Sequence, residues 1–226
     1  MKIQMLNLLT NDLDAIIDFY TGMQLPLIER SSDHVSFQIG SSQLTFVQSN
    51  EVEHPFYHVA FNITESKMDL AISWLQAKGI VINLVDTYSE TWNSHSVYFY
   101  DSVGNIMELI ARHNSPSTSN GTFTSEDLLN ISEIGLPAVD VTILSDYLLH
   151  QYNEQIYKSS SPTFTPIGDE EGLLILSVLG RQWLGSNKNA EIFPLEIVIE
   201  HEKEEPIQVL DYPYTISTRS SGHLHD

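Results

Sequence analysis

Apolar and polar residues recur along the chain with two periods, about 3.6 residues and two residues, which are typical of helices and strands. The segment 3–9 predicts a strand, and Asp12 is placed to cap a helix that runs to about Met23. One face of that helix is apolar through Leu13, Ile16, Ile17 and Tyr20. Three strands are expected next, at 27–30, 35–39 and 43–48, the last two joined as a hairpin through Gly40, Ser41 and Ser42.

The same pattern then restarts. We expect a strand at 57–63 and a helix at 66–78 that ends at Gly79. Three further strands are expected at 81–85, 96–100 and 106–111. A strand, a helix and three strands therefore occur twice within the first 112 residues.

A stretch rich in Ser, Thr, Asn and Gly, Asn114 to Thr124, reads as a linker, and a third copy of the pattern follows it. At an offset of 128 residues, Asp12 aligns with Asp140 and Gly40 with Gly168. The third copy would comprise a strand at 134–139, a helix at 142–156 and a hairpin strand at 173–179. The segment 193–199 starts a fourth unit, which lacks a convincing helix and is truncated.

Composition and charge narrow the class of protein. The chain has 226 residues, is 42% apolar and contains no cysteine, so disulfides and thiolate chemistry are absent. It carries 30 acidic and 10 basic side chains, and a net charge of −20 disfavours nucleic acid and anionic lipid as partners. No apolar run is long enough to span a membrane, and the first residues do not resemble a secretory signal, so we expect a cytoplasmic protein.

Two polar residues stand out on apolar strands, His58 and Glu108. Alternation along the strand puts His58, Ala60 and Asn62 on one face, opposite the side that must cover a helix. The same argument places Glu108 on that face and leaves Met107 and Leu109 toward the helices. An imidazole and a carboxylate therefore both lie on the face away from the helices, to which Gln43 and Thr45 also point by their alternation.

Three segments carry a family resemblance: TNDLDAIIDFYTGMQLPL, YHVAFNITESKMDLAISWLQAKGI and HSVYFYDSVGNIMELIAR. They resemble the vicinal oxygen chelate superfamily, which includes glyoxalase I, extradiol dioxygenases and bleomycin resistance proteins. The resemblance covers 1–112 well and 130–200 weakly. Its best motif comprises Asp101, Gly104, Asn105, Glu108 and Leu109, with Ser102 where proline is usual.

The resemblance implies an α+β fold in which paired βαβββ modules form curled mixed sheets with a concave cup, followed by a third, degenerate module. We expect a paired glyoxalase-like domain at 1–113, a linker at 114–125 and a degenerate, truncated module at 126–226. The degenerate module would be a lid, a substitute for a dimer interface, or a scaffold that completes the first cup. We favour the scaffold.

The resemblance also implies a metal site with positions at Met5, Gln43, His58 and Glu108. A divalent metal (Fe, Mn, Zn or Ni) would take His58, Glu108 and Gln43 as ligands, an incomplete set because the Met5 thioether is a poor ligand for these ions. The second histidine of an iron dioxygenase is missing from its expected place, and His95 is the nearest substitute. In the third module the equivalent positions are Glu133, a site near Glu171 or Gly172, and Pro194, so a second metal centre is not expected.

Further candidates for contact with a substrate are Gln43, Asn62, Trp92, His95 and Tyr98, although strand aromatics commonly serve packing alone. Glu108 is the candidate catalytic group, a metal ligand or a general base whose pKa burial would raise.

Two functions stay open. One is a metal-dependent lyase, isomerase or dioxygenase acting on a small molecule with vicinal oxygens. The alternative is a metal-free small-molecule binding protein of the bleomycin-resistance type. The sequence leaves open whether the chain is an enzyme, and whether it is a monomer or a homodimer.

Overall fold

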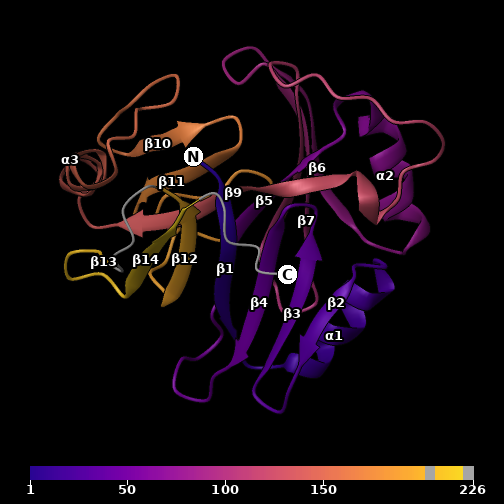
Figure 1. The fold of residues 1–226 in the computed structure, drawn as a ribbon, viewed down its shortest axis with the longest axis horizontal. Coiled ribbons are helices and arrows are strands. Elements are labelled where there is room, and N and C mark those ends of the chain that lie inside the picture. The colour runs from indigo at the N-terminus through magenta and orange to yellow at the C-terminus, as the bar shows by residue number, and fades with distance from the viewer. Residues whose placement is uncertain (202–206, 221–226) are drawn as a thin grey trace.

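The computed structural model describes residues 1–201 and 207–220, and within them the chain forms three α-helices and one sheet of 14 strands (Figure 1). The helices are α1 (Leu13–Gly22), α2 (Met68–Ala77) and α3 (Val141–Tyr152), with 3-10 turns at Glu65–Lys67 and Ser125–Asp127. The strands of the first half are β1 (Ile3–Thr10), β2 (Leu27–Arg30), β3 (His34–Ile39), β4 (Ser42–Gln48), β5 (His58–Ile63), β6 (Ile82–Ser89), β7 (Ser94–Tyr100) and β8 (Ile106–Arg112). Those of the second half are β9 (Leu128–Ala138), β10 (Phe164–Asp169), β11 (Gly172–Val178), β12 (Leu195–Glu200), β13 (Ile207–Gln208) and β14 (Tyr214–Arg219).

The sheet is built from four modules, each of which pairs its first and last strands in parallel. These parallel pairs are β1 with β4, β5 with β8, β9 with β11, and β12 with β14. The first two modules have the full strand, helix and three-strand order, the third has one strand fewer, and the described part of the fourth has no helix. The expected α+β fold of paired modules with a curled mixed sheet is therefore confirmed, as is the degenerate third module.

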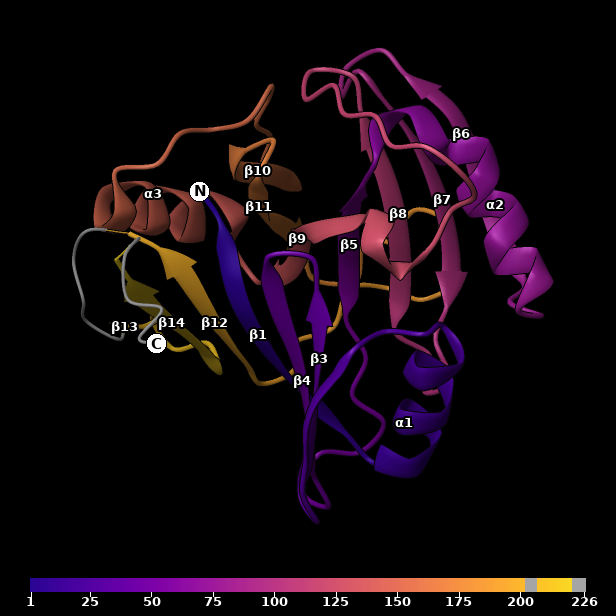
Figure 2. The same ribbon diagram turned by 45° about the vertical axis from the view of Figure 1, so that its right-hand side comes forward.

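The helices lie outside the curled sheet (Figure 2). Two of them start with the same cap, because an oxygen of Asp12 accepts a hydrogen bond from the Ala15 amide at 2.9 Å and Asp140 accepts one from Ile143 at 3.0 Å. The offset of 128 residues between the two caps confirms the internal repeat. The third helix is shorter than predicted, because Asn153 has a left-handed backbone (φ 51°) that ends it.

The modules pair differently from the arrangement that the family resemblance implied. Along their lengths, β5 of the second module runs antiparallel to β9 of the third, and β1 of the first runs antiparallel to β12 of the fourth. The second and third modules therefore share one concave face, whereas the expectation placed the first and second modules around one cup. Sequence order suggested that neighbouring modules one and two pair, but local patterns carry no information about which strand edges meet.

Strand β9 contains a bulge that determines the face of the sheet to which its side chains point. Ala60 pairs with Glu133 and Phe61 with Ile131, so Ser132 is an extra residue opposite β5. Ile131 and Ile134 both lie in the hydrophobic core. Without the bulge, alternation would put Glu133 on the same face as Ile131; with it, Glu133 turns to the concave face. This irregularity explains why the sequence predicted the strand only from residue 134, whereas β9 begins at Leu128.

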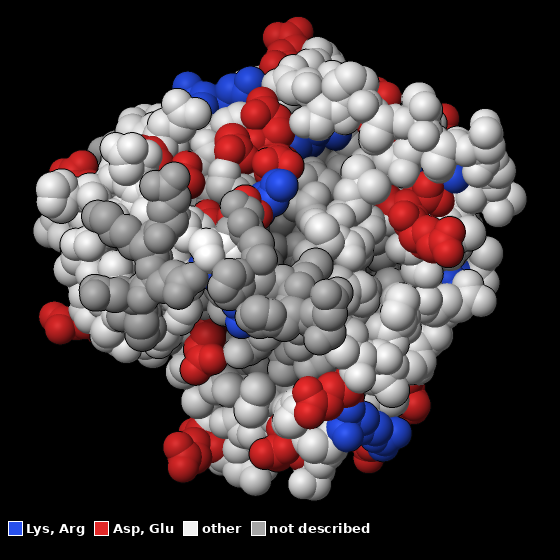
Figure 3. Space-filling view, viewed as in Figure 1, with Lys and Arg blue, Asp and Glu red and all other residues white. Residues whose placement is uncertain are grey.

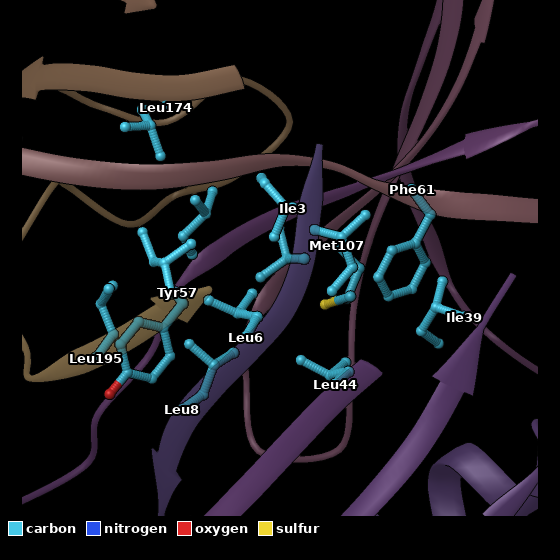
Figure 4. Packing of buried hydrophobic residues seen from close by; sticks show 14 of the residues in the cluster. Ile3, Leu6, Leu8, Ile39, Leu44, Tyr57, Phe61, Met107, Leu174 and Leu195 are labelled. Atoms are coloured by element: carbon cyan, nitrogen blue, oxygen red, sulfur yellow. The ribbon is translucent and has the colours of Figure 1, made fainter. Parts of the chain in front are cut away.

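The larger of two hydrophobic clusters joins the modules. Leu6 of β1, Leu44 of β4, Phe61 of β5 and Met107 of β8 are at most 1% exposed and belong to one cluster (Figure 4). This shared packing holds the strands that carry the polar residues of the concave face in fixed register.

Acidic side chains are spread over the surface of the molecule, and few basic ones accompany them on the face that Figure 3 shows. None of the helices in residues 1–201 and 207–220 is long and apolar enough to cross a membrane.

Candidate metal and substrate site

Three buried side chains from two modules meet on the concave face. His58 Nε2 lies 3.6 Å from Glu108 Oε2 and 3.6 Å from Glu133 Oε2. The side chains are 6%, 3% and 5% exposed, respectively, and one ligand atom of each lies within 4.8 Å of the others. The second module supplies His58 and Glu108, and the first strand of the third module supplies Glu133.

Arg112 at the end of β8 fixes one of the carboxylates. Its Nη2 lies 2.5 Å from Glu133 Oε1 and donates to Ser132 Oγ, while its Nε donates to Asn62 Oδ1 at 3.1 Å. The guanidinium therefore occupies one oxygen of Glu133 and leaves the other facing His58. The bulge residue Ser132 contributes to this arrangement directly, through its hydroxyl.

Burial and charge set the protonation of the cluster. Burial, followed by the neighbouring charge of Glu133, raises the pKa of Glu108 to about 7. Burial acts to raise the pKa of Glu133, but the hydrogen bond from His58 and the charge of Arg112 outweigh it, and the result lies below the usual value. Burial acts to lower the pKa of His58, yet the hydrogen bond to Glu133 and the charges of both carboxylates raise it overall.

The donor set fits a divalent cation. One imidazole nitrogen and two carboxylate oxygens are the hard or borderline ligands that Fe, Mn, Zn and Ni accept, and three protein ligands leave positions open. Two donors that are each about 2.1 Å from one ion lie about 3 to 4 Å apart, which matches the two separations of 3.6 Å. In the third module, Ile175 pairs with Gly135 as Glu108 pairs with Ala60, so the place of a fourth ligand is apolar.

The cluster opens into a cavity of about 210 Å³. Its walls are largely aromatic and apolar, with serines along one side and a single arginine: Trp92, Tyr98, Ile110, Phe164, Ile175, Trp183, Leu184, Ser89, Ser94, Ser96 and Arg181. The cavity is of the size and polarity of a small-molecule site.

The segment that joins β11 to β12, residues 179–194, covers one side of this cavity, and we call it the covering loop. Its Trp183 ring stacks on the His58 ring with centroids 5.0 Å apart. It is held to the second module by Lys188, which donates to the Gly104 carbonyl at 2.6 Å, and by Asn187, which accepts a hydrogen bond from the Tyr100 hydroxyl.

The structure brings some of the sequence-predicted residues together and separates others. Trp92 and Tyr98 line the cavity beside His58 and Glu108. Gln43, Asn62 and His95 are not among its lining residues.

The separated residues have other contacts. Gln43 lies on β4, where its amide donates to Thr45, and its strand partner is Met5 of the first module. Asn62 binds Arg112 and the Glu170 carbonyl behind the cluster. His95 lies on the opposite face of β7, with Nδ1 2.6 Å from His113 Nε2.

The sequence did not predict three parts of this site, namely Glu133, Arg112 and the covering loop. Glu133 was recognised as a metal-equivalent position of the third module, but its meeting with His58 depends on the pairing of β5 with β9. Trp183 and Arg181 lie in a segment without periodicity, so no local signal pointed to them.

Comparisons with known proteins bear on the family and on the fold. Residues 2–109 match the model of the Glyoxalase/Bleomycin resistance protein/Dioxygenase superfamily. This segment, just under half of the chain, therefore matches that superfamily. A search of curated proteins found no match.

One solved structure supports the fold over the whole chain. A proposed dioxygenase from Bacillus subtilis superimposes with a TM-score of 0.67 at 14% identity, over 100% of this chain and 87% of its own. A lactoylglutathione lyase from Agrobacterium tumefaciens matches at 22% identity and a TM-score of 0.41, over 48% of this chain and 91% of its own. A fosfomycin resistance protein from Listeria monocytogenes, complexed with Mn(II) and sulfate, matches at 22% identity and a TM-score of 0.40, over 48% of this chain and 87% of its own.

Proposed function

We propose that the protein is a metal-dependent enzyme that acts on a small molecule with vicinal oxygens, by lyase, isomerase or dioxygenase chemistry. The observation that carries the proposal is the convergence of His58, Glu108 and Glu133 at the floor of a cavity of about 210 Å³. Buried carboxylates are costly unless a cation or hydrogen bonds compensate them, so a functional reason for keeping two together is expected.

His58, Glu108 and Glu133 would hold the ion, and a bound divalent ion would supply Lewis-acid stabilisation of negative charge on a substrate oxygen. Arg112 holds Glu133 in one orientation, which keeps its free oxygen toward His58. Without a bound ion, Glu108 has a pKa of about 7, so its carboxyl group could instead accept or return a proton near neutral pH. The covering loop limits the access of water to the cavity through Trp183 and Leu184.

Metal content after exposure to Mn, Fe, Zn or Ni tests the proposal. Wild-type protein should retain about one ion per chain after desalting, and His58→Ala and Glu133→Gln should lose it. Matched controls are His95→Ala, which removes an imidazole outside the cavity, and Glu171→Gln, which removes a carboxylate whose side chain is 61% exposed.

Retention of the ion in both controls, together with its loss in both site variants, supports the proposal. Wild-type protein that binds none of the four metals overturns it. Circular dichroism of each variant separates loss of metal from loss of fold.

A metal-free binding protein is a second candidate, and the charge balance of the cluster favours it. Arg112 neutralises one carboxylate, and the raised pKa of His58 allows a second positive charge beside Glu108. Under this alternative the wild-type protein would bind a small aromatic ligand with unchanged affinity in the presence of a chelator.

The cytoplasmic location, the lack of nucleic-acid partners and a monomeric or homodimeric state stay predictions. The same holds for a linker at 114–125 between a first domain and a scaffold module.

A further inference from the structure

Arg181 of the covering loop lines the cavity without a charged partner. Within the described residues, its guanidinium takes part in no ion pair and no side-chain hydrogen bond, and it lies over the Phe164 ring, 4.6 Å from the ring centroid. Burial lowers the pKa of Arg181, with no compensating charge. An arginine has five donors, and most arginines near a protein interior bind a carboxylate or a carbonyl.

Arg112 shows what a structural arginine looks like in the same molecule. It is 2% exposed and binds Glu133, Ser132 and Asn62. Arg181 has the opposite character, because its guanidinium lies over the face of the Phe164 ring while its N–H donors stay available to a molecule in the cavity. In a chain with 30 acidic and 10 basic residues, a carboxylate partner for Arg181 would be readily supplied, so its lack of one among the described residues is informative.

The rest of the cavity indicates what that molecule is. Trp92, Tyr98, Phe164 and Trp183 provide flat apolar walls, which favour a planar ring. Glu108 and Glu133 at the floor repel a second negative charge, so a monoanion is favoured over a phosphate dianion. The planar fork of an arginine matches a carboxylate in two parallel hydrogen bonds.

We propose that Arg181 forms an anion subsite at the wall of the cavity, and that the ligand is an aromatic carboxylate whose ring lies between this subsite and the His58, Glu108 and Glu133 cluster. The inference rests on the proposed function in taking the same cavity as the substrate site, and it adds the chemical group by which the substrate is selected.

Two matched pairs of compounds test the subsite and the metal separately. We would measure dissociation constants by calorimetry for benzoate and benzamide, and for 3,4-dihydroxybenzoate and 3,4-dihydroxybenzamide, with metal-loaded wild-type protein. The acid-to-amide comparison reports the anion subsite, and the comparison with and without the diol reports the metal. The variants are Arg181→Gln and, as a control, Arg30→Gln, which removes an exposed arginine paired with Asp14.

Wild-type protein should bind each acid about tenfold more tightly than its amide, or better, since a charge-assisted pair of hydrogen bonds replaces a neutral one. Arg181→Gln should abolish this preference and leave amide affinity within about twofold, whereas Arg30→Gln should preserve it. Equal affinity for acid and amide in wild-type protein, no binding of either acid, or a preference that persists in Arg181→Gln overturns the inference.

Failure of the anion subsite and failure of the proposed function give different results. Loss of the acid preference with metal content intact removes the anion subsite and leaves the proposed function standing. An acid preference in protein that binds no metal sustains the subsite and overturns the metal-dependent enzyme.

Discussion

Glu108 is a buried carboxyl group whose pKa of about 7 makes the stability of the metal-free protein depend on pH. Its value in the folded state lies above the usual value of 4.5 for an exposed glutamate, so the folded state favours the protonated form. The resulting stabilisation is fully present below pH 4.5 and is lost as the pH rises through about 7. A shift of this size corresponds to a difference on the order of 3 kcal/mol.

We therefore expect that, in the presence of a chelator, wild-type protein loses unfolding free energy relative to Glu108→Gln between pH 5 and pH 8. Urea unfolding of both proteins at pH 5 and at pH 8 measures this difference in unfolding free energy. The raised pKa of His58 acts in the same direction, since its stabilisation is also lost as pH rises. If the unfolding free energies of the wild-type protein and of Glu108→Gln changed equally between the two pH values, the raised pKa of Glu108 would be contradicted.

Among single residues, the sequence indicates those whose side chains are polar although their strand is apolar. His58 and Glu108 were visible because each is polar within an apolar strand, and alternation alone assigns them to one face. Arg112 ends the same strand and follows the same alternation, but its role became visible only with its partner Glu133, 21 residues further along the chain.

The covering loop depends on two glycines that differ in the space around them. Gly185 has φ of 68°, and a Cβ there would overlap Cβ and Cγ of Tyr98; Gly180 has φ of 81°, and a Cβ there meets nothing within 4 Å. Both alanine variants pay a backbone cost of about 1 kcal/mol for a positive φ. Only Gly185→Ala must also displace the loop from the cavity wall.

Gly185→Ala should weaken the binding of 3,4-dihydroxybenzoate by about tenfold or more, because Arg181 and Trp183 move with the loop. Gly180→Ala should bind it as the wild type does. Calorimetry gives the affinities, and circular dichroism shows that both variants keep the fold. Similar affinity in both would mean that the loop does not form the cavity wall in solution.

Helices, caps and hairpins were predictable because each follows from residues close together in sequence. Asp12 and Asp140 identify two helix starts, and Gly40 in a hairpin turn and Gly168 near the end of β10 both have positive φ. The start of β9 was not predictable from the sequence, because its bulge interrupts the alternation on which strand prediction relies.

For the whole molecule, the pairing of modules predicts that residues 1–113 do not form the site alone. Removing the rest of the chain takes away β9 and β12, which cover the edges of β5 and β1, and it removes Glu133. Unpaired edges and exposed core should make the fragment aggregate, as size-exclusion chromatography would show, and metal should not bind.

Co-expression with residues 126–226 should restore a soluble complex, which is the matched control for the truncation. A fragment of residues 1–113 that unfolds cooperatively as a monomer and binds metal would contradict the assignment of the cup to modules two and three.

The bulge at Ser132 also bears on how such a site is gained or lost. Deleting the single codon for Ser132 would remove only the extra residue, so Glu133 would stay opposite Ala60 and still face His58, without the hydroxyl that binds Arg112. Deleting Ile134, which lies beyond the bulge, would instead exchange the two faces of β9 on one side of the deletion, so that either Glu133 or the core residues after it must change face. A change of chain length by one residue can therefore add or remove a metal ligand in this fold as effectively as a substitution. Relatives that share all three ligand types but differ in length at this point should be compared by strand register before they are compared by residue identity.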